Sequence, residues 1–556
     1  MQNSTISPEA RLRQLLTVER NDLWVAVIYS VAIGVLTLAL PIATQALVNT
    51  IALGNLMQPL LLLSALVFAT LAASGVLQVM RFYVVENIQR RVFVRVSSDT
   101  IHRLLRARLS AFEAHHGPEL VNRFLDVVTL QKSGATLLVD GLSVVMQTAI
   151  GMVLLAVYHP WLLAYSFILL AAILFVIFPL GSGAVVTSVA ESKSKYALVA
   201  WLQETARFPY TFRSPQGAKF AIGRTDDLVA EYLRHRAGHF RILLRQVSGA
   251  FAINALASSA LLSVGGWLVI QRQLTLGQLV AAEIVVQLVL SGFSKLGKHL
   301  ETYYDLAAAA DKLGYLQDLP LEEPGAVELA RRESPAGFQA RIASFGYQRD
   351  QTVLGGIEWD VRPGARVGVR GPSGAGKSTL FDLVPGYRDA AQGTVEIDGH
   401  SVDELRRTSL REQVVLLREP EIFEGTILDN LRLGSDADPA TVRHVLAQAG
   451  ILDAVLALPE GLETRLSTGG IPLSAGQVLR LALARAILQR PRLLLIDETL
   501  DRSHDSPGIE RLLDVLFDRE APWTLVVASS HPSLLARCDR VYDLSESKLS
   551  PGEVTA

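Results

Sequence analysis

Six long apolar runs between residues 23 and 300 limit the folds that this chain can adopt. A helix that spans a bilayer needs about 20 mostly apolar residues. The runs are Leu23–Ala46, Leu60–Val79, Leu142–Val157, Trp161–Leu180, Val247–Ile270 and Leu279–Phe293. The third and sixth are short, so their ends are the least well defined. One such run could be a buried helix of a water-soluble domain, but six in series predict an all-helical membrane domain.

Composition separates this region from the rest of the chain. Half of the 556 residues are hydrophobic and only 19% are charged, compared with about 25% charged in soluble domains. Residues 337–556 have a soluble composition, so at least two domains are expected. The net charge of −2 gives no reason to expect nucleic acid as a partner. The single cysteine, Cys538, excludes an intrachain disulfide and a cysteine-based metal site, and a small buried residue is expected there.

The positive charges predict the orientation in the membrane. Loops 49–58 and 158–160 contain no Lys or Arg, whereas the long stretches 81–133 and 182–246 are rich in them. Since positive residues concentrate on the cytoplasmic side, both termini and both long stretches are placed in the cytoplasm. The polar segment Met1–Asn21 is followed by no cleavage pattern, so no removable signal peptide is expected.

The two long stretches mix apolar and charged residues at helical spacing, as in Val92–Val96 and Tyr196–Trp201. We expect membrane helices that continue into the cytoplasm and are joined by turns near 115–118 and 207–209. These turns would dock onto the second domain. His115 and His116 have no further ligands at useful spacing nearby, which favours a surface turn over a metal site.

A change of pattern marks the domain boundary. Residues 316–337 carry paired prolines and glycines without apolar periodicity, which is typical of a linker. We expect a membrane domain at 1–316, a linker at 317–336 and a soluble domain at 337–556. In the soluble domain, short apolar strands alternate with amphipathic helices, which predicts an α/β fold.

The most specific motif is a glycine-rich phosphate loop between a predicted strand and the predicted helix Leu380–Val384. Glycines let backbone N–H groups close around phosphate oxygens. Lys377 would neutralise the β- and γ-phosphates of ATP, and the Ser378 hydroxyl would complete the shell of a Mg²⁺ ion. The motif residues expected to bind the nucleotide are Gly371, Ser373, Gly374, Gly376, Lys377, Ser378 and Thr379.

A second apolar strand ends in two acids, Asp497 and Glu498. The first acid at such a strand end holds Mg²⁺, and the second can orient or deprotonate the attacking water. Many strands end in an acid, so this pair alone is not specific. Together with the phosphate loop in the same domain, it indicates a nucleotide-hydrolysing site.

The segment Leu473–Gln477 is similar to the signature motif of ATP-binding cassette (ABC) proteins, with Ala475 where Gly is usual. It lies about 20 residues before Asp497, as in that family. The whole chain resembles a half-transporter of the ABC exporter type. This resemblance implies an all-α membrane domain, an α/β P-loop ATPase domain and a dimer, either homodimer or heterodimer. Two ATP molecules would lie between the phosphate loop of one chain and Ser474, Gly476 and Gln477 of the other.

The resemblance implies roles for further positions. Tyr347 would stack on adenine, unless it is an ordinary strand aromatic, and His531 would be the switch histidine that contacts the γ-phosphate. The segment Phe423–Asn430 resembles the region where the membrane domain of exporters docks.

Three positions depart from the family pattern. Arg418 occupies the place of a glutamine near Mg²⁺, Asp501–His504 replaces a Ser-Ala-Leu-Asp segment, and Ser467–Gly470 replaces an acidic motif. The first two changes put communication between the sites in doubt. Hydrolysis is still expected because the phosphate, metal and base groups remain; a regulatory subunit with weak ATPase activity in a heteromeric complex is the alternative.

One short segment near the end of the first span bears on the cargo. Leu40–Gln45 resembles peptide and protein exporters of the type I secretion kind, which implies peptide or protein export by alternating access. Lipid, polysaccharide or drug export is the alternative. The expected partners are a second half-transporter, membrane lipid, the substrate and a periplasmic adaptor, in a bacterial inner membrane. Glu283 and Gln287 share one helix face and would line the path, unless Glu283 reaches interfacial water or pairs with Arg272.

Overall fold

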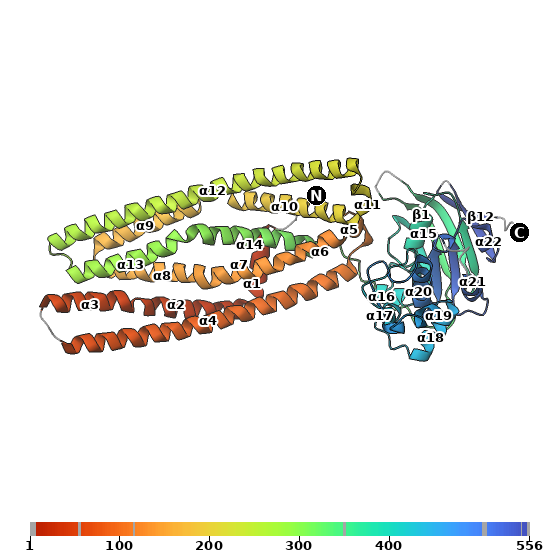
Figure 1. Ribbon diagram of the computed structural model, residues 1–556, viewed down its shortest axis with the longest axis horizontal. Coiled ribbons are helices and arrows are strands. Elements are labelled where there is room, and N and C mark those ends of the chain that lie inside the picture. Colours follow the sequence, from red (N-terminus) through yellow and green to blue (C-terminus); the bar gives the residue numbers. More distant parts are fainter. Residues whose placement is uncertain are drawn as a thin grey trace. The chain divides into compact units, whose positions relative to one another are not determined.

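The computed structural model describes residues 7–53, 57–114, 117–347, 352–502, 509–545 and 547–552. The chain divides into two compact units, Met1–Leu321 and Glu322–Ala556. We describe each unit by itself. The first is helical and the second contains all the strands of the described residues (Figure 1). This agrees with the predicted change from a membrane domain to an α/β domain.

The first unit consists of helices in the part of the chain that the structure describes. Their bounds are α1 (Pro8–Val18), α2 (Arg20–Thr37), α3 (Ala39–Leu53), α4 (Met57–Arg106), α5 (Leu109–Ala114), α6 (Gly117–Asn122), α7 (Asp126–Thr136), α8 (Leu142–Tyr158), α9 (Pro160–Ile177), α10 (Ala184–Arg207), α11 (Pro209–Phe212), α12 (Pro215–Ile270), α13 (Leu276–Ser294) and α14 (Leu296–Gln317). Within this unit α2 lies along α4, and α10 lies along α12 (Figure 1).

Six helical segments of the described chain are long and apolar enough to cross a membrane. They are Arg20–Thr50, Leu60–Arg106, Leu120–Tyr158, Pro160–Ile177, Pro215–Ile270 and Leu276–Gln317. Each contains most or all of one predicted apolar run, so the prediction of six spans is confirmed. The third and sixth segments are much longer than their apolar runs, because the helices continue into the mixed sequence beside them.

Two helices are far longer than a bilayer requires. Helix α4 has 50 residues and α12 has 56. At about 1.5 Å per residue each exceeds 70 Å, whereas the hydrocarbon core is about 30 Å thick. The second predicted turn is present, since α10 ends at Arg207 and the single turn α11 leads into α12. The first predicted turn includes His115 and His116, which lie outside the described residues.

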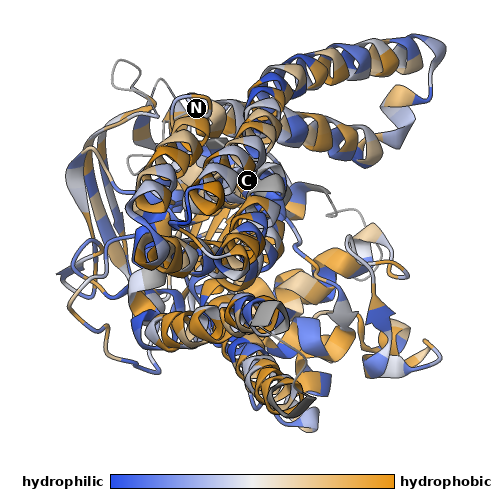
Figure 2. Ribbon diagram, turned by 90° about the vertical axis from the view of Figure 1, so that its left-hand side faces the viewer, coloured by the Kyte–Doolittle hydropathy of each residue, from blue (hydrophilic) through white to orange (hydrophobic). Residues whose placement is uncertain are grey.

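The surface of the helical unit is strongly apolar. Figure 2 shows orange, hydrophobic residues along the helices of this unit. On α4, Leu62 and Phe68 each leave 75% of their surface exposed in the single chain. Large apolar patches of this kind mark surfaces that face lipid or another chain. The interruption between α2 and α3 has a local cause, because Pro41 has no N–H to donate to Thr37 one turn earlier.

The second unit has two main sheets within its described residues. The strands are β1 (Phe338–Phe345), β2 (Leu354–Val361), β3 (Arg366–Arg370), β4 (Gln392–Ile397), β5 (His400–Ser401), β6 (Val414–Leu417), β7 (Gly425–Thr426), β8 (Arg465–Leu466), β9 (Leu493–Asp497), β10 (Thr524–Ala528), β11 (Arg540–Ser545) and β12 (Lys548–Gly552). One sheet has the order β2-β1-β4-β5, the other has the order β12-β11-β3-β10-β9-β6, and β7 pairs with β8.

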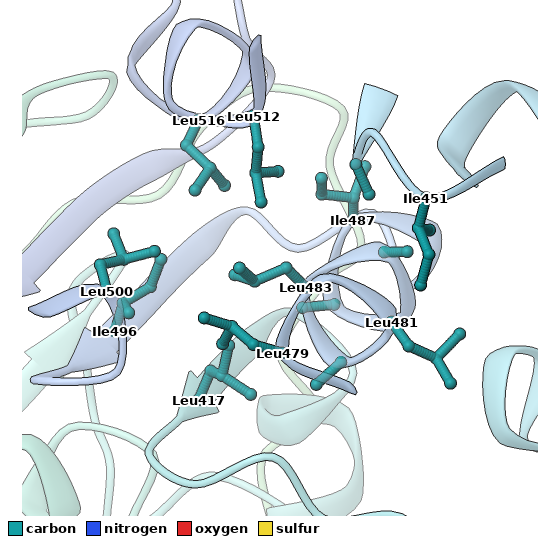
Figure 3. Packing of buried hydrophobic residues seen from close by; sticks show 14 of the residues in the cluster. Leu417, Ile451, Leu479, Leu481, Leu483, Ile487, Ile496, Leu500, Leu512 and Leu516 are labelled. Carbon is teal, nitrogen blue, oxygen red and sulfur yellow. The ribbon is translucent and has the colours of Figure 1, made fainter. Parts of the chain in front are cut away.

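Helices pack around these sheets. They are α15 (Lys377–Leu383), α16 (Arg407–Arg411), α17 (Ile427–Arg432), α18 (Pro439–Gln448), α19 (Leu452–Leu456), α20 (Ala475–Leu488), α21 (Ile509–Phe517) and α22 (Pro532–Leu535). Strands β9 and β10 are buried at every residue and pair in parallel, as expected for a sheet covered on both faces. Figure 3 shows side chains from α20, β9 and α21 meeting in one apolar cluster.

The segment before β1 packs against the rest of the second unit. Leu329 and Ala336 are buried, and the Val327 N–H donates to the Glu404 carbonyl at 2.9 Å. Residues 322–337 are therefore packed against the domain, although their composition is typical of a flexible linker. The finer division at 316 and 336 stays a prediction.

Candidate functional site

The predicted phosphate loop connects β3 to α15. Gly374 and Gly376 have φ values of +82° and +98°, which residues with a side chain rarely adopt. A Cβ atom on Gly371 would lie 2.2 Å from the Leu544 carbonyl oxygen. These positions therefore require glycine. Helix α15 begins at Lys377, earlier than predicted, because the chain turns at Gly376 directly into the helix.

Lys377 is held in the loop and is only 6% exposed. Its ammonium group donates to the carbonyl oxygens of Gly371 and Pro372 at 2.8 and 3.0 Å. It also lies 3.0 Å from Oε1 of Glu498. The residue predicted to bind phosphate thus contacts the residue predicted to be the base.

The sheet topology explains why these two segments meet. Strands β3 and β9 lie on either side of β10 and run parallel to it. Their carboxyl ends therefore lie at the same edge of the sheet, where the loops of such sheets form ligand sites. Glu498 follows β9 with φ +56° and donates its N–H to the Ala528 carbonyl at 3.0 Å. A non-glycine residue in this region is uncommon, and such strained residues cluster at functional sites.

Asp497 is buried, and the two oxygens of its carboxylate have different surroundings. Oδ2 accepts a hydrogen bond of 2.7 Å from Nε of Arg418. Oδ1 is buried and has no hydrogen-bond partner among the described residues. A buried carboxylate oxygen without a partner is costly unless an ion or water completes it. With the exposed Ser378 at the start of α15, this free oxygen fits the oxygen ligands that Mg²⁺ requires.

Arg418 points into the site. Its Nη2 donates to the Ser378 carbonyl at 2.7 Å and to Oδ1 of Asp382 at 2.9 Å. Burial lowers the pKa of this guanidinium, but the hydrogen bonds to Asp497 and Asp382 outweigh burial and raise it, so Arg418 stays charged. The sequence leaves open whether Arg418 enters the site or points to solvent, and the structure shows that it enters the site.

Tyr347 lies next to the phosphate loop. Its hydroxyl oxygen is 2.7 Å from Oγ1 of Thr379. The Arg388 guanidinium lies 4.6 Å from the centre of the ring, and 52% of the residue remains exposed. The ring therefore lies beside the phosphate loop, and its hydroxyl has a specific partner there.

The segment before His531 is held by Asp501, a contact that the motif analysis missed. Asp501 accepts a hydrogen bond from the Ser529 hydroxyl, and from both N–H and hydroxyl of Ser530 at 2.9 Å. The Ser529 hydroxyl oxygen accepts the N–H of His531 at 3.0 Å. Asp501 thus positions the turn that carries the predicted switch histidine. Ser503 and His504 lie outside the described residues.

The signature segment forms the start of α20. The side chains of Ser474 and Gln477 each accept the backbone N–H of the other, at 3.4 and 2.8 Å. A Cβ atom on Gly476 would meet nothing within 4 Å, so the space above it is open. Between the described residues of this turn and Lys377, no hydrogen bond or ion pair exists. The chain brings together Lys377, Ser378, Asp497, Glu498 and Tyr347, but not the signature.

The segment Phe423–Asn430, which the resemblance predicts to dock, is held by one buried side chain. Asn430 is fully buried and bonds to the backbone N–H and carbonyl of Phe423. Phe423 itself remains 43% exposed. A rigid turn with an exposed aromatic residue is suited to a contact with another domain.

A glycine loop after β3, two acids at the end of the parallel strand β9 and a unit with six apolar helical segments define a class of protein. It is a membrane protein joined to a nucleotide-binding α/β domain. Comparisons with known families agree. Residues 354–501 match the ABC transporter family, and residues 23–292 match the ABC transporter transmembrane region. The chain therefore belongs to the ABC transporters, with a transmembrane region fused to an ABC ATPase domain.

Several named proteins are similar to this chain. The mycobactin import ATP-binding/permease protein IrtB of Mycolicibacterium thermoresistibile is 28% identical over 61% of this chain and 58% of its own length. A multidrug efflux ATP-binding/permease protein of Mycobacterium bovis is 32% identical over 63% of this chain and 28% of its own length. The chain thus spans less than two thirds of the length of each of these relatives.

A solved structure shares the fold along nearly the whole chain. The structure of a bacterial Atm1-family ABC exporter with ATP bound superposes with a TM-score of 0.84 and covers 97% of this chain and 96% of that one. The sequence identity is 22%, so this likeness concerns the fold. It supports the predicted architecture of six spans and an ABC ATPase domain.

Proposed function

We propose that this chain hydrolyses ATP with Mg²⁺ and uses the energy to export a substrate, as one half of a dimer. The observation that carries the proposal is the convergence of Lys377, Glu498 and Asp497 at one edge of the sheet. These groups supply phosphate binding, a base and a metal ligand, which phosphoryl transfer to water requires.

The residues divide the chemistry between them. When bound, Mg²⁺ neutralises charge on the phosphate oxygens, and Asp497 and Ser378 would hold it. Lys377 would turn from the carbonyls of Gly371 and Pro372 to the β- and γ-phosphates. This releases Glu498 to orient the attacking water and accept its proton. His531, held by the Asp501 turn, would contact the γ-phosphate, and Tyr347 would stack on adenine.

The partner completes the site. The signature residues Ser474, Gly476 and Gln477 do not reach the phosphate loop of their own chain, and the space above Gly476 is open. A second half-transporter, the same chain or a homologue, would place its signature on the ATP. Closure of the two ATPase domains would then drive alternating access, because ATP binds the closed state more tightly than the open state.

The cargo is proposed more broadly. The resemblance at Leu40–Gln45 supports a peptide or protein, whereas the efflux and import names of the relatives favour the alternative of a small molecule such as a drug. A lipid or polysaccharide is a further alternative. The proposed location is a bacterial inner membrane, with both termini and the ATPase domain cytoplasmic and with a periplasmic adaptor as an optional partner.

Purification of the chain alone tests the proposal. The expected results are a dimer by mass measurement and Mg²⁺-dependent ATP hydrolysis in lipid. Inside-out vesicles should then accumulate a labelled cargo, tested with peptides and with drugs, only when ATP is present. A dimer that binds ATP but neither hydrolyses it nor transports would contradict the proposal.

One observation favours a second candidate function, that of a regulatory subunit. Arg418 forms an ion pair with one oxygen of Asp497, the proposed metal ligand. The Lys377 ammonium forms an ion pair with the carboxylate of Glu498, the proposed base. In a regulatory subunit these contacts would persist with ATP bound. Hydrolysis that appears only after a different half-transporter is added would support this function over the first.

A further inference from the structure

A row of alternating charges runs through the nucleotide site of the second unit. Nε of Arg388 lies 3.0 Å from Oδ2 of Asp382, and Nη2 of Arg418 lies 2.9 Å from the other oxygen of Asp382. Nε of Arg418 then lies 2.7 Å from Oδ2 of Asp497. The row therefore runs from Arg388, whose guanidinium lies over the Tyr347 ring, to Asp497, the proposed metal ligand.

Both carboxylates in this row are almost completely buried. The side chain of Asp382 is 3% exposed and that of Asp497 is 1% exposed, whereas the Arg418 side chain is 37% exposed. Buried carboxylates need compensating positive charge. Here two guanidinium groups balance two carboxylates before any ligand binds. With the usual glutamine in place of Arg418, the same four positions would carry one net negative charge.

Arg418 also lies directly beside the phosphate loop, because its Nη2 donates to the carbonyl oxygen of Ser378. A guanidinium group matches phosphate oxygens with two parallel N–H groups. Its partial exposure leaves the side chain room to turn. A rotation of Arg418 away from Asp497 would free its Nε–H, which now donates to that carboxylate, for a phosphate oxygen bound in the loop.

We propose that Arg418 is a built-in counter-cation that lets this site bind nucleoside triphosphate without a divalent metal. The guanidinium supplies on the phosphates the positive charge that a metal ion supplies in the family pattern. The inference rests on the proposed ATP binding and goes beyond it, because it assigns the site a second ligand form, the metal-free triphosphate.

The test is equilibrium binding of ATP to the full-length chain in lipid nanodiscs, in EDTA and in Mg²⁺. For the unchanged protein, the two dissociation constants should agree within about threefold. In Arg418→Gln the ratio of the EDTA value to the Mg²⁺ value should rise roughly tenfold or more, the usual effect of losing a hydrogen bond to a charged group.

Two further variants keep the test independent of folding. Arg388→Gln removes the other guanidinium on Asp382 but does not touch Asp497, so ATP binding should change equally with and without Mg²⁺. Arg418→Lys keeps the charge and should hold the ratio closer to that of the unchanged protein than Arg418→Gln does. Thermal unfolding of all three variants checks that they fold.

The outcomes separate the two proposals. If the unchanged protein binds ATP only with Mg²⁺, the inference is wrong and ATP binding stands. If Arg418→Gln leaves the ratio unchanged, or Arg388→Gln raises it as much, Arg418 is not the counter-cation. If ATP binds under neither condition, the proposed function fails.

Discussion

The ammonium group of Lys377 lies 3.0 Å from Oε1 of Glu498, so the lysine proposed to bind phosphate and the proposed base form an ion pair. The lysine is 6% exposed, whereas the glutamate side chain is 53% exposed. Phosphates would therefore enter on the solvent-exposed side of the ion pair, next to Glu498. Their entry would separate Glu498 from Lys377. Binding and hydrolysis share this step, because the incoming phosphate takes the lysine and releases the base.

Glu498→Gln should lower ATP turnover by about 10²-fold or more, the range expected for loss of a general base. ATP binding should stay at least as tight, because a neutral amide no longer competes with phosphate for Lys377. Phosphate release and equilibrium ATP binding measure the two effects.

Glu510→Gln is the matched control for this change. Glu510, on α21, is also exposed and pairs with Arg537. It should hydrolyse ATP at the parent rate. Glu498→Gln hydrolysing at that same rate would show that Glu498 has been given the wrong role.

Asp501→Asn should lower kcat about tenfold while the KM for ATP stays within twofold. Asparagine cannot accept all the hydrogen bonds from Ser529 and Ser530, so the turn carrying His531 would be less well held. Loss of these bonds should cost about 1–3 kcal/mol of unfolding free energy. Steady-state kinetics and denaturant unfolding measure both effects.

Asp514→Asn is the control for Asp501, because Asp514 makes one surface ion pair, with Arg537. It should change neither kcat nor stability measurably. A loss of stability in Asp501→Asn without a loss of kcat would make Asp501 a structural residue only.

Glu283→Gln should reduce cargo-stimulated ATPase activity and leave basal activity and dimer assembly unchanged. The Glu283 carboxylate accepts a hydrogen bond of 2.9 Å from Gln287, and no ion pair joins it to Arg272 among the described residues. An acid on a membrane helix costs about 2.5–3.5 kcal/mol on insertion scales, which favours an inward, hydrated position on the proposed path.

Ser258→Ala tests the structural alternative for this helix. Gln287 also donates to the Ser258 hydroxyl at 3.4 Å, which links α13 to α12. The variant removes that link without changing charge, so cargo stimulation should survive. Poor assembly of Glu283→Gln with a parallel fall in basal activity would contradict the path assignment.

Cys538 should resist alkylation in the folded protein. Burial raises the pKa of its thiol from 9.0 to about 12, so the neutral thiol dominates below that pH. At pH 8 the thiolate fraction, and with it the alkylation rate, should be about 10³-fold below that of the unfolded chain. Mass spectrometry after iodoacetamide treatment, with and without denaturant, measures the difference. Rapid labelling of the folded protein would place Cys538 outside the core.

The sequence by itself determined the features that consecutive residues encode. Length and apolarity predicted the six spans, and helical spacing in the flanking stretches predicted the extension of α4 and α12. The glycine pattern before Lys377 and the acids after β9 were also recognisable, because a phosphate loop and a strand end need only neighbouring residues in a fixed order.

Only the tertiary structure decided how distant residues pair. The parallel strands β3, β10 and β9 bring Lys377 to Glu498, and β6 beside β9 brings Arg418 to Asp497. No local pattern encodes which neighbour a side chain will meet across a sheet. For the same reason the sequence left the direction of Arg418 open and showed Asp501 only as a departure from a motif. Strand order and burial make Arg418 a hydrogen-bond donor to Asp497, the predicted metal ligand, and make Asp501 the residue that holds the turn before His531.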